Sequence, residues 1–193
     1  MNPRYYVLPA VLLGLVVAVV VVNRPAPSAA PQPLTVAASQ PATRSDIDVY
    51  FSPKGGCTDA IVREINSAKS NIYVQAYSFT SLPIAKALAE ANNRDVLVKV
   101  VLDKSQRTEK YSAADFLAHE HVMVFIDPKH AIAHNKIMII DRQTVITGSF
   151  NFTKEAEEHN AENLLIIHDK ALAEKYFANW VQHFNHSEVY EGK

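Results

Sequence analysis

Hydrophobic residues from position 46 onward follow two spacings, one typical of strands and one typical of helices. Short apolar runs predict strands at residues 47–51, 72–77, 96–102, 122–126 and 164–167, and a close strand pair at about 133–140 and 144–149. Apolar residues at helical spacing predict helices at residues 58–69, 82–91, 111–119 and 170–184. Strands that alternate with helices predict an α/β fold in which helices sandwich a mixed β-sheet.

The first 45 residues differ from the rest of the chain. Residues 5–22 form an uncharged, mostly apolar run, which predicts a signal peptide or membrane anchor over residues 1–22. Five prolines between positions 25 and 41 predict an extended Pro/Ala-rich linker over residues 23–45. We therefore expect residues 46–193 to be an exported, periplasmic domain. It would be either secreted through the inner membrane or anchored to it, and both alternatives stay open.

The net charge argues against a protein that binds nucleic acid by bulk attraction. The chain has 19 Lys and Arg and 20 Asp and Glu, and three of these basic residues but no acidic residue precede position 46. Residues 46–193 therefore have a formal charge of −4, so any attraction to phosphate must be local. Candidates are Lys104, Arg107, Lys110 and Lys129, with Tyr111 to stack on single strands. An equally plausible interpretation is that these four basic residues are ordinary solvated surface residues.

Cysteine and histidine offer few metal sites. Cys57 is the only cysteine, which excludes an intrachain disulfide and a cysteine-based zinc site. Its position near a helix start predicts a small buried apolar residue. His183 and His186 lie three residues apart and could bind a metal, but we interpret them as part of an exposed helix face.

The most specific chemical pattern lies in residues 134–151. This segment contains, in order, His134, Lys136, Asp141, Gly148, Ser149 and Asn151. A lone histidine or lysine on a strand is usually structural, but an imidazole, an ammonium, a hydroxyl and an amide in one pocket suit a phosphate monoanion. We therefore interpret the segment as a site that cleaves phosphodiesters, with the imidazole as nucleophile.

The predicted strand pair decides which of these side chains meet. Residues two apart on a strand share a face, so His134 and Lys136 should point the same way. A two-residue turn directly after Asp141 would place Ser149 opposite the lysine and Asn151 opposite the histidine. A register error of one residue would still leave them near each other. Asp141 falls on the opposite face, and we expect it to support the site rather than touch substrate.

This pattern resembles the HKD motif of the phospholipase D superfamily. The fuller similarity is to its small bacterial members with one motif per chain, the metal-independent endonucleases encoded on conjugative plasmids. It extends to residues 50–57, which include Tyr50-Phe51-Ser52-Pro53, and to Asn160-Ala161-Glu162-Asn163, and it covers nearly all of residues 46–188. The resemblance implies the phospholipase D/nuclease fold over the catalytic domain, residues 46–193.

The resemblance also implies roles for individual residues. The position of His134 is that of a nucleophile that forms a covalent phosphohistidine, and the positions of Lys136 and Asn151 hold phosphate oxygens. Glu162 matches the acid that orients the imidazole. We therefore expect the catalytic residues to be His134, Lys136, Asp141 and Glu162, and the substrate-binding residues to be Lys136, Ser149 and Asn151. No metal and no other cofactor is expected.

One motif per chain provides the nucleophile but no second group that could act as the general acid. The leaving oxygen must be protonated, and the other histidines form no comparable pattern. A homodimer with a two-fold axis through the active site would supply a second His134. In the superfamily, proteins with two motifs in one chain achieve this internally.

Three functions are compatible with the sequence. The leading hypothesis is an endonuclease of low specificity that acts on DNA or RNA. The alternative is phospholipase D-type hydrolysis of phospholipids, and thus lipid degradation, with membrane attachment through residues 5–22. Against it, the chain is small and has no evident acyl-binding insertion. A non-catalytic phosphodiester-binding module is the third, which the intact motif disfavours.

Overall fold

The computed structural model describes residues 46–193, so the segments interpreted as signal or anchor and as linker lie outside the described residues. The strands are β1 (Ile47–Ser52), β2 (Asn71–Ala76), β3 (Leu97–Asp103), β4 (Met123–Asp127), β5 (Lys136–Ile140), β6 (Thr144–Gly148), β7 (Glu162–His168) and β8 (Glu188–Tyr190). The helices are α1 (Cys57–Ser67), α2 (Leu82–Asn93), α3 (Ala114–His119), α4 (Lys154–Glu158) and α5 (Lys170–Phe184), with a 3-10 turn η1 (Lys104–Arg107). Across residues 46–193, no helix combines the length and apolar character needed to cross a membrane.

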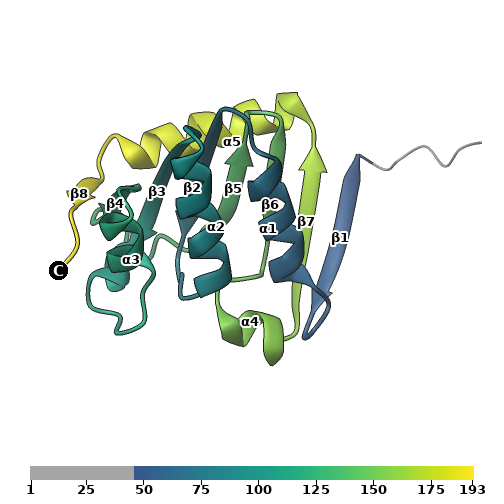
Figure 1. The fold of residues 1–193 in the computed structure, drawn as a ribbon, viewed down its shortest axis with the longest axis horizontal. Helices are drawn as coiled ribbons and strands as arrows, with labels where there is room; N and C mark the ends of the chain where they lie inside the picture. Colours follow the sequence, from purple (N-terminus) through teal and green to yellow (C-terminus); the bar gives the residue numbers. More distant parts are fainter. Residues whose placement is uncertain (1–45) are drawn as a thin grey trace, which may run out of the picture. The chain divides into compact units, whose positions relative to one another are not determined.

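The strands form one mixed sheet, as the sequence predicts. Their order is β1-β7-β6-β5-β2-β3-β4-β8 (Figure 1). The neighbours β2, β3 and β4 run parallel, and all the other pairs are antiparallel. Every predicted strand and helix has a counterpart, whereas α4, η1 and β8 match no predicted element.

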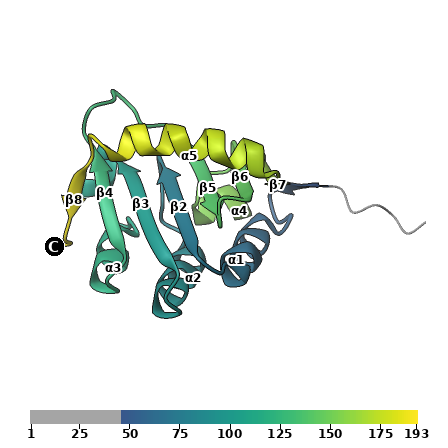
Figure 2. The same cartoon turned by 90° about the horizontal axis from the view of Figure 1, so that it is seen from above.

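Helices cover both faces of this sheet. α1, α2 and α3 lie on one face and α5 lies across the other (Figure 2). Fully buried residues such as Ile61 and Leu88 fill the first interface, and Val101 and Trp180 belong to the second. The indole Nε1 of Trp180 donates a hydrogen bond of 2.9 Å to the Val74 carbonyl, so its polar atom is satisfied inside the core. The predicted α/β sandwich is confirmed.

The strand directions bring polar residues to one edge of the sheet, here called the polar edge. The carboxyl ends of β1, β2, β3, β4 and β6 meet there with the amino ends of β5 and β7. Residues 128–135, here called the edge loop, connect β4 to β5. The loop is held at the ends of intervening strands: the Tyr77 amide donates to the Asn135 carbonyl at 2.9 Å, and the Ala133 amide donates to Asp103 Oδ2 at 2.7 Å.

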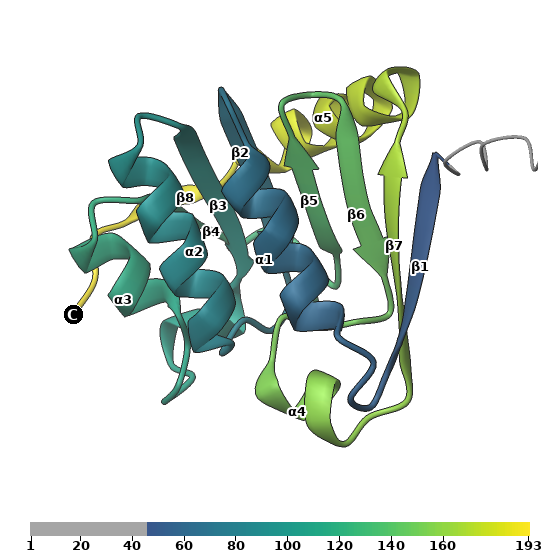
Figure 3. The same cartoon turned by 45° about the vertical axis from the view of Figure 1, so that its right-hand side comes forward.

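The short helix α4 fixes the start of α1. Figure 3 shows α4 at the polar edge, next to the amino end of α1. Glu157 of α4 accepts hydrogen bonds from the backbone amides of Gly56 at 3.0 Å and Thr58 at 2.7 Å, which otherwise have no partner within the helix. Gly56 has no side chain that could cap the helix. Glu157, about 100 positions further along the chain, therefore caps it instead.

The hairpin between β5 and β6 has a three-residue loop, and the predicted two-residue loop is wrong. Ile140 pairs with Thr144, so residues 141–143 form the connection. The first of them is drawn out of the ladder, because the Asp141 amide donates to the Asn71 carbonyl at 2.8 Å. The predicted register is therefore off by one residue, although both strands still reach the polar edge.

Two predictions about single residues have opposite outcomes. Cys57 is fully buried at the first position of α1, as predicted, and burial followed by the charge of Glu157 raises the pKa of its thiol to about 11. The exposed helix face assigned to His183 and His186 is wrong. Their side chains are only 14% and 24% exposed, His186 lies beyond the end of α5, and both contact Asp127.

We expect Glu157→Ala to lower the free energy of unfolding by roughly 1–3 kcal/mol, because two amides at the start of α1 lose their acceptor. Unfolding in urea, followed by circular dichroism, measures the change. The control is Glu158→Ala, which removes only a surface pair with Lys154 at 3.6 Å and should cost less than about 0.5 kcal/mol. Equal urea midpoints for the two variants would contradict the capping role.

Candidate active site

His134 and Lys136 lie side by side at the polar edge. Lys136 is the first residue of β5 and is 8% exposed, whereas His134 is exposed in the edge loop before the strand rather than within it. Lys136 Nζ donates to the His134 carbonyl at 2.8 Å and lies 3.2 and 3.3 Å from the two ring nitrogens. The Tyr77 ring packs against the imidazole with centroids 4.7 Å apart. The imidazole is thus held beside a cation and stays accessible to solvent.

The ammonium of Lys136 is poorly hydrated. Burial lowers the pKa of Lys136 below its ordinary value of 10.5, and the negative charge of Glu162 acts in the opposite direction. A charge that has lost water gains from a new anionic partner, because charge-assisted hydrogen bonds replace the missing hydration. The environment of Lys136 therefore favours binding of an anion such as a phosphate group.

Ser149 and Asn151 reach the same pocket from the segment after β6. The alternate residues Phe150 and Phe152 are fully buried in the core, which leaves Ser149 and Asn151 on the pocket side. Ser149 Oγ accepts a hydrogen bond from the Asn163 amide at 3.1 Å, so its own hydroxyl hydrogen remains available to a ligand. Asn151 Oδ1 is buried and has no hydrogen-bond partner. Both side chains can therefore turn a donor toward a phosphate oxygen.

Gly148 is required where β6 approaches β7. A Cβ atom at this position would lie 2.2 Å from the Asn163 carbonyl oxygen, far inside van der Waals contact. Its φ of 147° is also a value that side chains disfavour. The glycine allows the two strands to come together below the pocket, which brings the start of β7 close to Lys136.

Glu162 is the first residue of β7 and completes the pocket. The lining residues are His134, Lys136, Gly148, Ser149, Asn151 and Glu162, around a volume of about 430 Å³. The Glu162 carboxylate accepts a hydrogen bond from Asn160 Nδ2 at 3.2 Å. Within residues 46–193, the expected hydrogen bond from the imidazole to this carboxylate is not formed, and the ring nitrogens face Lys136 Nζ instead.

Asp141 lies just after β5, at the end of the strand away from the pocket, and is not among the residues that line the pocket. Its carboxylate accepts hydrogen bonds from the amides of Lys69, Ser70 and Asn71 at 2.7–3.2 Å, and from the Ser70 hydroxyl at 2.8 Å. Burial alone would raise the pKa of Asp141, but these bonds lower it below 3.8. Asp141 thus fastens the loop between α1 and β2 to the hairpin.

Two residues of the site were missed in the sequence. Tyr77 supports the imidazole, and Gln75 is fully buried below the edge loop, where its Nε2 donates to Asn135 Oδ1 at 3.2 Å. A buried glutamine in an otherwise apolar strand is an exception to the usual core composition. Its presence in the run of residues 72–77 was a usable signal of a polar contact beneath the site.

The pocket combines one exposed imidazole with groups that can bind an anion. An imidazole, an ammonium, a hydroxyl and an amide surround it, and Glu162 is the only carboxylate among its lining residues in the described part of the chain. This set can hold the two non-bridging oxygens of a phosphodiester while a ring nitrogen reaches the phosphorus.

Known proteins are similar to this chain in sequence and in fold. The family described as "Cardiolipin synthase, PLD-like domain" matches residues 61–185. A "Phospholipase D" of Rickettsia felis is 46% identical over 138 residues, which cover 72% of this chain and 69% of the relative. The structure of a phospholipase D family member, Nuc from Salmonella typhimurium, matches with a TM-score of 0.73 at 38% identity, over 76% of this chain and 98% of that one. NucT from Helicobacter pylori shares the fold, with a TM-score of 0.70 at 24% identity over 75% and 98% of the two chains.

We expect Asp141→Asn to lower the free energy of unfolding by roughly 2–3 kcal/mol at neutral pH, because a neutral amide accepts the four hydrogen bonds less strongly. Since hydrogen bonds depress the folded-state pKa of Asp141, its stabilisation is present above 3.8 and is lost as the pH falls through the lower folded value. The difference from the wild type in urea unfolding should therefore shrink below that pH.

The control for this series is Asp59→Asn, an exposed carboxylate in the first turn of α1. It should change the unfolding free energy by less than about 1 kcal/mol. A destabilisation by Asp141→Asn that stays constant between neutral and acidic pH would contradict the assigned role of the carboxylate.

Proposed function

Because the chain belongs to the phospholipase D superfamily, we propose that it is a metal-independent endonuclease of low specificity that cleaves DNA and RNA through a phosphohistidine. As a member of this superfamily it is a phosphodiester hydrolase. The proposed part is the polymer substrate and the reaction path, which the following contacts support.

In the first step, a neutral ring nitrogen of His134 attacks phosphorus. A P–N bond forms while the P–O bond to the leaving oxygen breaks. Lys136, with the donors of Ser149 and Asn151, stabilises the charge that develops on the non-bridging oxygens. Once the phosphate attracts Lys136 Nζ, the imidazole is released from its contact with that atom, and Glu162 in the same pocket can accept the proton of the other ring nitrogen.

The second step regenerates the free enzyme. Water attacks the phosphohistidine, the P–N bond breaks, and a base must accept a proton from that water. The same group must earlier have protonated the leaving oxygen. Within residues 46–193, His134 is the only imidazole that lines the pocket, so we assign this part to His134 of a second copy in a homodimer.

Exposed apolar residues flank the pocket where such a second copy would lie. Ile132 in the edge loop is 57% exposed, and Phe51 near the end of β1 is 65% exposed. They lie at the polar edge on either side of the catalytic residues, because Phe51 pairs with Asn163 and Ile132 precedes His134 by two positions. A two-fold contact through the site would remove both from water.

Basic and aromatic residues along the polar edge support the proposal that the substrate is a nucleic acid. Lys104, Lys110 and Lys129 are exposed and follow the carboxyl ends of β3 and β4. Tyr111 is 70% exposed, with Lys110 Nζ 5.2 Å from its ring centroid. Arg107 is less available because it pairs with Glu188. A strip of cations with one stacking surface suits a single strand that continues past the pocket.

Hydrolysis of phospholipids is the second candidate. The relatives named Phospholipase D, at 46% identity for the Rickettsia felis protein, favour it. The apolar run at residues 5–22 would bring an exported, periplasmic domain to the inner membrane, where lipid is at hand. The pocket itself is lined by polar groups, which suits a phosphate but provides no wall for acyl chains.

We expect the full-length protein to cleave plasmid DNA and RNA in excess EDTA, and to release no choline from phosphatidylcholine vesicles. His134→Ala should lower the cleavage rate roughly a thousandfold or more, and Lys136→Ala roughly a hundredfold, because they remove the nucleophile and the main positive charge. The controls are His119→Ala and Lys170→Ala, which change exposed residues and should leave the rate unchanged. Choline release without cleavage of nucleic acid would establish the phospholipase instead, and binding without turnover of any substrate would establish a binding module.

We expect wild-type protein mixed with an equal amount of His134→Ala to lose activity per wild-type chain. After subunits exchange, about half of the wild-type chains would face an inactive partner, so the activity per wild-type chain should fall about twofold. Sizing chromatography coupled to light scattering gives the oligomeric state of the same samples. Unchanged activity per wild-type chain, or a fully active monomer, would overturn the shared site.

A further inference from the structure

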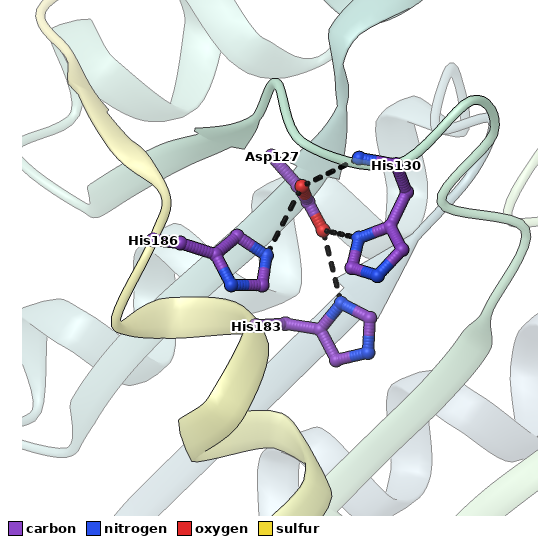
Figure 4. Close-up of side chains that lie close together, drawn as sticks. All are labelled: Asp127, His130, His183 and His186. Carbon is purple, nitrogen blue, oxygen red and sulfur yellow. Dashed lines mark hydrogen bonds and ion pairs between the residues drawn. The ribbon is translucent and has the colours of Figure 1, made fainter.

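A second cluster of ligand-type side chains lies outside the catalytic pocket. Asp127, at the end of β4, is surrounded by the imidazoles of His130, His183 and His186 (Figure 4). The Asp127 Oδ2 atom lies 2.8 Å from His130 Nδ1 and 2.9 Å from His183 Nδ1, and Oδ1 lies 3.2 Å from His186 Nε2. One ligand atom from each of the four residues lies within 4.8 Å of all the others.

The carboxylate at the centre of this cluster is completely removed from water. The Asp127 side chain is 0% exposed, and its Oδ1 also accepts backbone hydrogen bonds from Lys129 at 3.0 Å and His130 at 3.4 Å. Asp127 therefore presents a buried carboxylate, oriented by two backbone amides, to the three imidazoles.

The three imidazoles are more hydrogen-bond partners than the Asp127 carboxylate uses. His186 Nε2 is buried and makes no well-directed hydrogen bond, although it lies 3.2 Å from Asp127 Oδ1. A buried ring nitrogen without a hydrogen-bond partner is costly, unless another group takes up its lone pair. The rings also lie close to one another, with centroids 4.6–5.6 Å apart, so their nitrogen atoms converge on a small volume beside the carboxylate.

We propose that Asp127, His130, His183 and His186 form a binding site for one zinc ion. Three imidazole nitrogens and one carboxylate oxygen are the ligand types and the number that zinc takes in closed tetrahedral sites. Ligand bonds of 2.0–2.1 Å place neighbouring donor atoms roughly 3.3 Å apart. The three contacts of Asp127, at 2.8, 2.9 and 3.2 Å, lie just below that spacing, and the four ligand atoms all lie within 4.8 Å of one another. Side-chain shifts on the order of 1 Å would therefore close the site around the ion.

The zinc site is structural and lies apart from the catalytic pocket. None of its four residues lines that pocket, and the sheet order separates β4 from β5 by two strands, or roughly 14 Å. Its ligands come from β4, the edge loop and the end of α5. The ion therefore joins the C-terminal segment to the loop that delivers His134 four residues after His130. A zinc ion here would depart from the expectation, drawn from the sequence, that the protein holds no metal.

Zinc titration of the full-length, metal-free protein tests this site. We expect about one zinc per chain by elemental analysis after gel filtration, and a rise in Tm of roughly 5–10 °C when free zinc exceeds Kd about a hundredfold. Cobalt at the same site should give the visible absorption of a tetrahedral ion. His130→Asn and His186→Asn should each weaken zinc binding roughly a hundredfold, whereas His119→Asn, at an exposed histidine outside the cluster, should bind as the wild type does.

The proposal is overturned if the folded wild-type protein takes up no stoichiometric zinc. It is also overturned if His130→Asn and His186→Asn bind zinc as tightly as His119→Asn, or if cobalt bound to the wild type lacks the tetrahedral absorption. The cluster would then be a network of contacts between three imidazoles and one carboxylate. These measurements do not involve phosphodiester cleavage, so their outcome is independent of the function proposed for His134.

Discussion

The buried ammonium of Lys136 is the constraint on which the catalytic pocket depends. A lysine that is 8% exposed at the first position of an internal strand has lost most of its hydration. The His134 carbonyl, its imidazole and the Tyr77 ring surround it, and the negative charge of Glu162 acts on it from the same pocket. A phosphate would add a direct anionic partner. The fold thus holds a poorly hydrated cation in the pocket, and this favours an anionic ligand there.

The arrangement of strands explains why this cation can be held so firmly. Alternating strand directions bring segments from across the sequence to one edge of the sheet, and the edge loop passes along that edge between Asp127 and Lys136. Its backbone is fastened at Tyr77 and at Asp103, so the loop that contains the exposed imidazole of His134 is nevertheless well positioned. Glu157, through α4, fixes the beginning of α1 next to the same edge.

Most strands and helices could be predicted from the sequence, because burial of one face makes apolar residues recur at the spacing typical of a strand or a helix. The proximity of His134 and Lys136 to the segment after β6 could also be predicted, since it depends only on the spacing of residues within one hairpin. The hairpin register was not, because Asp141 is drawn away by Lys69, Ser70 and Asn71, some 70 positions earlier. The contact of His183 with Asp127 could not be predicted for the same reason, because the two residues are 56 positions apart in the sequence. Side-chain contacts between distant segments leave no periodic trace in either segment.

The direction of β1 links the two opposite edges of the sheet. The strand begins at Ile47, at the edge of the sheet opposite to the polar edge, and its six residues span roughly 20 Å. Its last residue, Ser52, pairs with Glu162, the first residue of β7 at the polar edge. A substitution at the start of β1 is therefore remote from the pocket, whereas one at its end alters the immediate surroundings of Glu162.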